Sequence, residues 1–392
     1  MPKRVGIEVS IAVAEAVTAC DCDVIAAYPI TPQTHIVESI SEKIAEGELD
    51  GEYICVESEH SALSACLGSS AAGARTFTST AGQGLELMHE VVYVAASMRL
   101  PIVMAVANRA ISSPLSVWGD HSDVMAVRDT GWIQVFCENG QEVFDLTVWA
   151  FRVAEDPEVL LPVMVHMDGF HLTHMVEPIE LMDREEVEKF LPPNKYPFPL
   201  DPAKPVTMGA FGPPEIYTET RMALDVAIIN SKKTILKAWD EFAELYGRKY
   251  SPVEKYMMDG AETVLLTMGS YSETASLAVE KMRAEGEKVG QLRLRLWRPF
   301  PFEELRDALK GVKTLIVLDR AMSLGGQGGP VCGEIRAALH GCRDDLNIVS
   351  FIGGLGGRSI SDQGFEDMIR RGMEIAVCGN SLQQFEMVGL RG

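Results

Sequence analysis

The first part of the chain alternates between two hydrophobic patterns. Short apolar runs, typical of buried strands, are separated by longer segments in which apolar residues recur with helical spacing. In chain order, the expected elements are helix 10–20, strand 24–27, helix 36–46, strand 53–56, helix 59–72, strand 75–79, helix 82–96 and strand 101–107. Strands and helices that alternate in this way predict an α/β fold with a parallel sheet.

The alternation stops near Asp183 and resumes near residue 261. The intervening sequence is charged and rich in proline, with a long helix expected near 222–246, which is typical of a linker or an arm over the core. The later segment predicts a smaller doubly wound α/β domain. Its expected elements are strands 263–268, 291–297, 314–318 and 347–351, and helices 273–285, 302–309 and 331–340. The sequence thus predicts domains at 1–183 and 257–384, an arm at 184–256 and a tail at 385–392.

Composition limits the possible partners. The chain has 392 residues, 47% of them hydrophobic, which is enough for a large core. It carries 35 Lys and Arg against 56 Asp and Glu, and a net charge of −21 argues against binding to nucleic acid or anionic lipid. We find no signal-peptide pattern and no 18-residue apolar run. The expected location is the cytoplasm, without a membrane contact.

The cysteines are dispersed along the chain. None of the eight forms a Cys-x-x-Cys pair, whereas zinc and iron–sulfur sites usually draw ligands from tight clusters. Disulfides are not expected in a large chain of this type. We therefore predict that this chain holds neither a metal site nor an iron–sulfur cluster.

Two turns follow expected parallel strands, at the sheet edge where open α/β folds place ligands. In Tyr-Pro-Ile-Thr-Pro at 28–32, the prolines stiffen the turn, and the Thr31 hydroxyl suits a small carboxylate. Thr31 could equally be a helix cap. Glu59 begins a helix directly after a strand, where an acidic residue is also common for structural reasons alone.

A third polar segment, 108–123, follows the strand 101–107. Arg109 could bind a carboxylate with two hydrogen bonds. The residues Asp120, His121 and Asp123 resemble a metal or acid–base cluster, but we favour a hydrogen-bonded loop. The glycine-rich segment 325–329 lacks the spacing and the lysine of a phosphate-binding loop, so nucleotide binding is not expected there.

The order of these segments and their amino-acid sequences resemble the α subunit of the 2-oxoacid:ferredoxin oxidoreductases, most of all those of pyruvate type. The similarity runs nearly from end to end. It rests on Tyr-Pro-Ile-Thr-Pro at 28–32, Val-Glu-Ser-Glu-His-Ser-Ala at 56–62, Gln-Gly-Leu at 83–85, Met-Arg-Leu-Pro-Ile-Val-Met-Ala at 98–105, Asn-Arg-Ala at 108–110, Arg-Asp-Thr-Gly-Trp at 128–132, Val-Ala-Glu-Asp at 153–156, Arg-Pro-Phe-Pro at 298–301 and Gly-Gly-Leu-Gly-Gly-Arg at 353–358.

The resemblance implies a fold and a cofactor. It implies a pyrimidine-type thiamine diphosphate-binding domain followed by a domain like the transketolase C-terminal domain. It also implies a cofactor shared with a β subunit, which would carry the diphosphate site, Mg²⁺ and at least one iron–sulfur cluster. Clusters of the 4Fe–4S type, γ and possibly δ subunits, ferredoxin and coenzyme A complete the expected partners.

The family's site residues fall on specific positions of this chain. The glutamate that contacts the aminopyrimidine corresponds to Glu59, the substrate threonine to Thr31 and the active-site arginine to Arg109. Pro29, Gly82 and Gln83 are expected beside the cofactor. We expect Thr31 and Arg109 to converge on one pocket from opposite sides, with Glu59 deeper.

Other functions remain open. The same chemistry could act on 2-oxoisovalerate, oxalate or another 2-oxoacid in place of pyruvate, since pocket volume cannot be obtained from sequence. Alternatively, the chain could be a non-catalytic scaffold subunit, although retention of Thr31, Glu59 and Arg109 argues against that.

Overall fold

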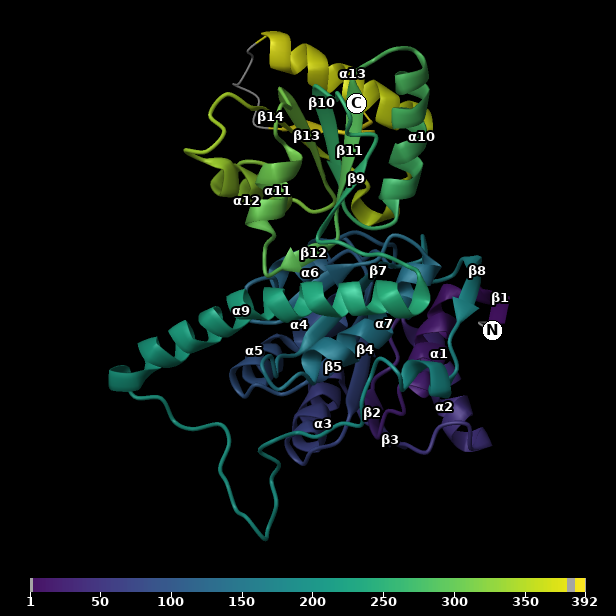
Figure 1. Ribbon diagram of the computed structural model, residues 1–392, viewed down its shortest axis with the longest axis vertical. Coiled ribbons are helices and arrows are strands. Elements are labelled where there is room, and N and C mark those ends of the chain that lie inside the picture. Colours follow the sequence, from purple (N-terminus) through teal and green to yellow (C-terminus); the bar gives the residue numbers. More distant parts are fainter. Residues whose placement is uncertain (1–2, 379–384, 392) are drawn as a thin grey trace.

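The computed structural model describes residues 3–378 and 385–391. Two sheets, each covered by helices, lie one above the other along the longest axis of the molecule (Figure 1). The larger unit contains the N-terminal half of the chain, and the smaller unit contains most of the C-terminal third. A separate ribbon of two antiparallel strands, β1 (Lys3–Glu8) and β8 (Val176–Leu181), was not predicted and lies beside the larger sheet.

The larger sheet has seven strands in the order β12-β6-β7-β5-β4-β2-β3. Its strands are β2 (Val24–Ala27), β3 (Glu52–Cys55), β4 (Thr76–Thr80), β5 (Ile102–Asn108), β6 (Ile133–Phe136), β7 (Val163–Asp168) and β12 (Leu296–Arg298). All neighbouring strands are parallel except β12, which runs antiparallel to β6. Every residue of β4, β5 and β7 is buried, as expected for strands covered on both faces. The predicted parallel α/β sheet is confirmed.

Helices cover both faces of this sheet. They are α1 (Val9–Ala19), α2 (Thr34–Glu46), α3 (Glu59–Ala71), α4 (Gly82–Leu87), α5 (His89–Ser97), α6 (Ser122–Ala126) and α7 (Gly140–Ala154), and the short α8 (Arg184–Val187) follows β8. Small residues let α3 pack closely on the strands, since Ala62 and Cys66 are fully buried on its inner face. The single helix expected at 82–96 is divided at Met88 into α4 and α5.

The smaller sheet has six strands in the order β15-β14-β13-β10-β11-β9. They are β9 (Val253–Tyr256), β10 (Thr263–Thr267), β11 (Val289–Leu294), β13 (Thr314–Asp319), β14 (Asn347–Ile352) and β15 (Glu386–Met387), and the helices are α10 (Tyr271–Ala284), α11 (Phe302–Ala308), α12 (Pro330–Leu339) and α13 (Asp362–Cys378). Strands β9 and β15 were not predicted: their residues were assigned to the arm and to the tail, and both strands join this sheet. The expected domain end at 384 lies outside the described residues.

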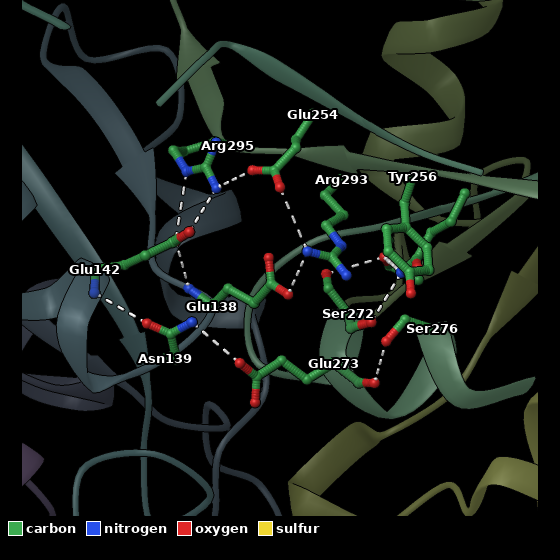
Figure 2. A network of polar contacts seen from close by, with 12 residues as sticks. Glu138, Asn139, Glu142, Glu254, Tyr256, Ser272, Glu273, Ser276, Arg293 and Arg295 are labelled. Carbon is green, nitrogen blue, oxygen red and sulfur yellow. Dashed lines mark hydrogen bonds and ion pairs between the residues drawn. The ribbon is translucent and has the colours of Figure 1, made fainter. Parts of the chain in front are cut away.

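One predicted strand was wrong in its extent. The segment 291–297, in which leucines alternate with polar residues, was expected to form one strand, but it divides at Arg295 into β11 of the smaller sheet and β12 of the larger sheet. Arg295 is buried where the two sheets meet, and its guanidinium binds Glu142 and Glu254 (Figure 2). Leucine recurs at every second position through both halves, at Leu292, Leu294 and Leu296, so the hydrophobic pattern did not mark the change of sheet.

The arm contains a helix longer than expected. Helix α9 runs from Pro214 to Tyr246 instead of beginning near residue 222, and its N-terminal half projects beyond the larger unit (Figure 1). Its C-terminal half packs on the core, where Trp239 stacks on Trp149 with ring centroids 5.0 Å apart. Among the described residues, no helix is both long and apolar enough to cross a bilayer.

Candidate active site

The predicted site residues lie at the edge of the larger sheet where its parallel strands end. Thr31 lies in the loop after β2, Glu59 begins α3 shortly after β3, Gly82 begins α4 after β4, and Arg109 follows β5. Strands β2, β4 and β5 are consecutive neighbours in the sheet. Because carboxyl ends of parallel strands share one edge, residues far apart in sequence meet here.

Arg109 joins the loop after β2 to the loop after β5. Its Nη1 donates a hydrogen bond to the carbonyl of Thr31 at 3.0 Å, and its Nε donates to the carbonyl of Ser116 at 2.9 Å. The guanidinium is buried, and burial lowers its pKa while the nearby Asp123 opposes that shift. No hydrogen bond to Nη2 occurs among the described residues, so this nitrogen can still bind an anion.

Thr31 and Arg109 are therefore in direct contact through the threonine backbone. We expected the pair to converge from opposite sides of a pocket, and the structure brings them together but adjacent. The Thr31 residue is exposed, and its hydroxyl has no hydrogen bond within the described chain. Pro29 is also exposed in the same loop, and nothing in the described part of the chain links it to Glu59 or Arg109 by a hydrogen bond.

Glu59 is almost completely buried at the first turn of α3, where Ser58 caps the helix by accepting a hydrogen bond from the Ser61 amide. Its carboxylate lies against Gly84 of α4, since a Cβ at Gly84 would sit 2.8 Å from Glu59 Oε1 and 2.5 Å from Thr80 Oγ1. Only glycine leaves room for the carboxylate at that point. No hydrogen bond to this carboxylate occurs among the described residues, which leaves it free to meet a ligand.

The beginning of α4 connects Glu59 with Arg109. Gly82 adopts a φ of +45°, and a Cβ there would lie 3.0 Å from Arg109 Cδ. Gln83 donates from Nε2 to the Ser112 hydroxyl at 2.8 Å, which ties α4 to the loop that follows Arg109. The structure thus brings Glu59, Gly82, Gln83, Thr31 and Arg109 around one helix N-terminus.

Asp123 holds two of these turns together, and sequence reasoning did not single out this role. Its Oδ2 accepts hydrogen bonds from the backbone amides of Gly82 at 3.0 Å and Arg109 at 2.9 Å. Asp120 accepts from the Ser122 hydroxyl and, at 3.0 Å, from the Gly356 amide of the smaller unit. The structure confirms a hydrogen-bonded loop here.

His121 belongs to an ion-pair cluster between the two units. Its Nε2 lies 3.0 Å from Asp168 Oδ1, and the same carboxylate pairs with Arg320 and accepts from the Ser270 amide at 2.8 Å. Burial tends to raise the pKa of Asp168, but the charges of Arg320 and His121 outweigh it and hold that pKa far below its usual range. Asp168 and Arg320 lie 152 positions apart, and no pattern in the sequence predicted that they pair.

A second polar network lies farther along the boundary between the units (Figure 2). Arg293 pairs with Glu138 at 2.9 Å, and Arg295 pairs with Glu142 and Glu254. Burial and the charge of Glu142 raise the pKa of Glu138 to about 8. The three carboxylates of Glu138, Glu142 and Glu254 share two guanidinium groups here, so ion pairing accounts for their clustering.

The polar groups beside α4 match those of an aminopyrimidine ring. Such a ring offers a nitrogen acceptor and an amino donor, which suit a carboxyl group beside an amide oxygen. Glu59 supplies the carboxyl group. Gln83 Oε1 and Thr80 Oγ1 are buried oxygens without a partner among the described residues, and they can accept a hydrogen bond from the amino group. The donor and acceptor set of this chain is therefore compatible with the pyrimidine end of thiamine diphosphate.

Solved structures share the architecture. A 2-oxoglutarate:ferredoxin oxidoreductase from Magnetococcus marinus, solved with 2-oxoglutarate, coenzyme A and succinyl-CoA bound, matches 95% of this chain and 66% of its own, with a TM-score of 0.74 and 21% identity. A split-gene transketolase, an inactive β4 tetramer, matches 95% of this chain and 100% of its own, with a TM-score of 0.57 and 10% identity. This chain therefore shares the α/β architecture of these two structures.

Sequence comparisons identify the family. The thiamine diphosphate-binding domain of pyruvate flavodoxin/ferredoxin oxidoreductases matches residues 15–240, and core domain II of pyruvate:ferredoxin oxidoreductase matches residues 261–365. This chain belongs to the pyruvate flavodoxin/ferredoxin oxidoreductase family, which confirms the resemblance and the predicted fold class.

Named relatives are similar over most of their length. Pyruvate synthase subunit PorA of Methanocaldococcus jannaschii is 49% identical over 89% of this chain and 90% of its own. Ketoisovalerate oxidoreductase subunit VorA of Pyrococcus abyssi is 47% identical over 89% of this chain and 88% of its own.

Proposed function

We propose that this chain is the α subunit of a pyruvate:ferredoxin oxidoreductase. The reaction converts pyruvate, coenzyme A and two oxidised ferredoxins into acetyl-CoA, CO₂, two reduced ferredoxins and one proton, and it is reversible. The observation that carries the proposal is that the first turn of α4 packs on both Arg109 and the buried Glu59 carboxylate, which has no hydrogen-bond partner among the described residues. The relatives named pyruvate synthase subunit support the choice of substrate.

Each residue has a distinct task in this proposal. When bound, thiamine diphosphate supplies the carbon nucleophile that attacks the 2-oxo group and the electron sink for decarboxylation. Glu59 exchanges a proton with the pyrimidine ring of the cofactor, which controls the basicity of its amino group. Arg109 and the Thr31 hydroxyl orient the substrate carboxylate, which leaves as CO₂. Pro29, Gly82 and Gln83 shape the wall beside the ring.

A β subunit completes the proposed site. We assign it the diphosphate and Mg²⁺ site and a 4Fe–4S cluster, and we assign further clusters to γ and δ subunits that pass electrons to ferredoxin. The arm offers a surface for the β subunit, since exposed apolar side chains surround a cleft of about 870 Å³ between α5 and the start of α9. Its lining includes Tyr93, Val94, Phe211 and Tyr217. We expect the complex in the cytoplasm, where coenzyme A is available.

Two other functions receive less support. The similarity to a ketoisovalerate oxidoreductase subunit favours 2-oxoisovalerate as the second candidate substrate, and oxalate or another 2-oxoacid is a weaker one. A scaffold subunit without catalytic residues would not need to keep a buried carboxylate without a partner, because such a group costs free energy unless it serves a ligand.

Reconstitution tests the proposal. This chain and the subunits encoded beside it would be co-expressed anaerobically and assayed with pyruvate, 2-oxoisovalerate, 2-oxoglutarate and oxalate, with and without coenzyme A. We expect thiamine-dependent reduction of ferredoxin with pyruvate and coenzyme A, and none from this chain alone. Preference for a branched 2-oxoacid would reassign the substrate. Activity that persists when Glu59 and Arg109 are both replaced would support a scaffold role.

A further inference from the structure

The buried carboxylate of Asp123 lies between the two turns that carry the candidate site. Asp123 is completely buried at the start of α6. Its Oδ2 accepts from the amides of Gly82 and Arg109, and its Oδ1 accepts from Asn108 Nδ2 at 3.1 Å and the Val124 amide at 2.7 Å. One side chain therefore connects the end of β5, the start of α4 and α6.

All four partners of this carboxylate are N–H donors. An ionised carboxylate has about four lone-pair sites, so it can satisfy every one of them. A protonated carboxyl, or the amide of an asparagine, carries hydrogen of its own, which would point at one of these N–H groups. That N–H group would then lose its hydrogen bond. This set of contacts thus requires a negative charge on Asp123.

We propose that Asp123 is a positioning residue that fixes the Gly82 turn against Arg109 only while it is ionised. Gly82 packs on the methylene groups of Arg109, and the neighbouring Gly84 packs on Glu59. Movement of the first turn of α4 would therefore shift Arg109 and Glu59 relative to each other. The link to catalysis rests on the proposed function, whereas the link between charge and loop position does not.

The surroundings make this charge sensitive to pH near neutrality. Burial raises the pKa of Asp123 to about 7, the Arg109 amide works against that rise, and the negative charge of Asp120 adds to it. The other groups that face it are the Arg109 guanidinium and, behind Asn108, the imidazole of His166, whose pKa burial holds well below its usual value. Protonation below about pH 7 would release the Gly82 or the Arg109 amide.

The sign of this effect separates positioning from stability. The carboxyl binds its proton more tightly in the folded chain than in the unfolded chain. Its contribution to the free energy of unfolding is therefore fully present at acid pH and decreases as the pH rises from about 4 to about 7. Loss of activity below pH 7 through Asp123 would therefore occur without a parallel loss of folded protein.

The first test is a pH profile of the reconstituted complex. We expect kcat/KM for the 2-oxoacid to fall about tenfold per pH unit below about pH 7. In Asp123→Asn this limb should disappear, leaving a value reduced by about tenfold to hundredfold at pH 8, as expected for a misplaced site. Asp120→Asn should move the limb to lower pH, because it removes the charge that raises the pKa of Asp123.

Asp319 provides a matched control. It is also a buried aspartate that accepts two backbone amides, those of Val331 and Cys332 at the start of α12, and burial raises its pKa to about 7. It contacts none of the candidate site residues, so Asp319→Asn should keep the acid limb. An unchanged limb in Asp123→Asn, or its loss in Asp319→Asn as well, would overturn the proposal.

The second test needs no activity. Hydrogen exchange of the full chain, corrected for intrinsic rates, should show weaker protection in peptides that contain the amides of Gly82 and Arg109 at pH 6 than at pH 8. Asp123→Asn should show the weaker protection at both pH values. Equal protection in the wild-type chain at the two pH values would refute the role of the charge, even if the complex has no 2-oxoacid activity or the variant does not fold.

Discussion

Arg109 Nη1 donates a hydrogen bond to the backbone carbonyl of Thr31 at 3.0 Å. This contact joins the loops after β2 and β5, two strands that β4 separates in the sheet. Because the carbonyl accepts this bond, the Thr31 hydroxyl and Arg109 Nη2 remain available for a substrate, and neither has a hydrogen-bond partner among residues 3–378 and 385–391. Since Arg109 binds the backbone of Thr31, replacement of the Thr31 side chain leaves this contact in place, and the roles of the two side chains can be tested separately.

Replacement of Arg109 by methionine should weaken both binding and turnover of the 2-oxoacid. Methionine keeps an unbranched, flexible side chain but lacks the guanidinium, so the charged contact with the carboxylate and the hydrogen bonds to Thr31 and Ser116 are lost. The drop in kcat/KM should correspond to about 2 to 5 kcal/mol of transition-state stabilisation. Steady-state kinetics of the reconstituted complex measure this. Arg184→Met removes an exposed arginine that forms only surface ion pairs and should have no effect. A wild-type KM and kcat in Arg109→Met would contradict the assignment.

Replacement of Thr31 by valine should have a smaller effect. The backbone contact with Arg109 survives, and only a neutral hydroxyl is lost, so the cost should be about 0.5 to 1.5 kcal/mol in kcat/KM. The same assay applies, with circular dichroism to verify the fold. A loss as large as that in Arg109→Met would mean that the hydroxyl also supports a buried charge.

Glu59→Gln should leave the fold intact and remove most turnover. The amide cannot exchange a proton with the pyrimidine ring, so kcat should fall by about 10² to 10⁴, the range for a positioned acid–base group. Preference among 2-oxoacids should not change. Glu90→Gln, an exposed glutamate in the first turn of α5, is the matched control. Near wild-type kcat at saturating thiamine diphosphate would rule out the proposed role of Glu59.

Gly84→Ala should disturb the site through steric contact alone. Its Cβ would lie 2.5 Å from Thr80 Oγ1 and 2.8 Å from Glu59 Oε1, so either the carboxylate or α4 must move. We expect a loss of stability of about 1 to 3 kcal/mol by overpacking and a larger relative loss of activity. Denaturant unfolding and kinetics measure the two effects. Gly68→Ala in α3 meets no atom within 4 Å and should be neutral or slightly stabilising.

The buried pair of Asp168 and Arg320 should hold the two units together. Arg320→Met leaves the carboxylate without its main cation and should cost about 3 to 5 kcal/mol in unfolding free energy. Asp168→Asn should be costly in the same way, and the double variant should cost less than the sum.

The pH dependence of this pair has a defined sign. The pKa of Asp168 is lowered in the folded chain, so its stabilising contribution is present at neutral pH and is lost only on acidification below about pH 4. The difference in unfolding free energy between wild type and Asp168→Asn should therefore shrink as the pH falls below 4. Additive single-variant effects would indicate that the pair does not act as a unit.

The sequence by itself determined the fold class, the parallel order of the early elements and the family. Strands β4 and β5 and the helices between them follow from local periodicity, because burial of a strand or of one helix face requires apolar residues at regular spacing. Thr31, Glu59 and Arg109 follow such strands, and parallel strands end at one edge, but it was the resemblance to the family that assigned their roles. The boundaries of α9 and the split of α4 from α5 were less accurate, since local pattern specifies helix ends poorly.

Only the tertiary structure decided how the segment 291–297 divides, because leucine alternates through both halves and this pattern does not identify the sheet that buries them. It also decided which polar residues meet. Asp123 accepts the amides of Gly82 and Arg109, and Asp168 pairs with Arg320 152 positions away. These contacts depend on chain crossings between strands and between units, and a single sequence carries no periodic signal for them.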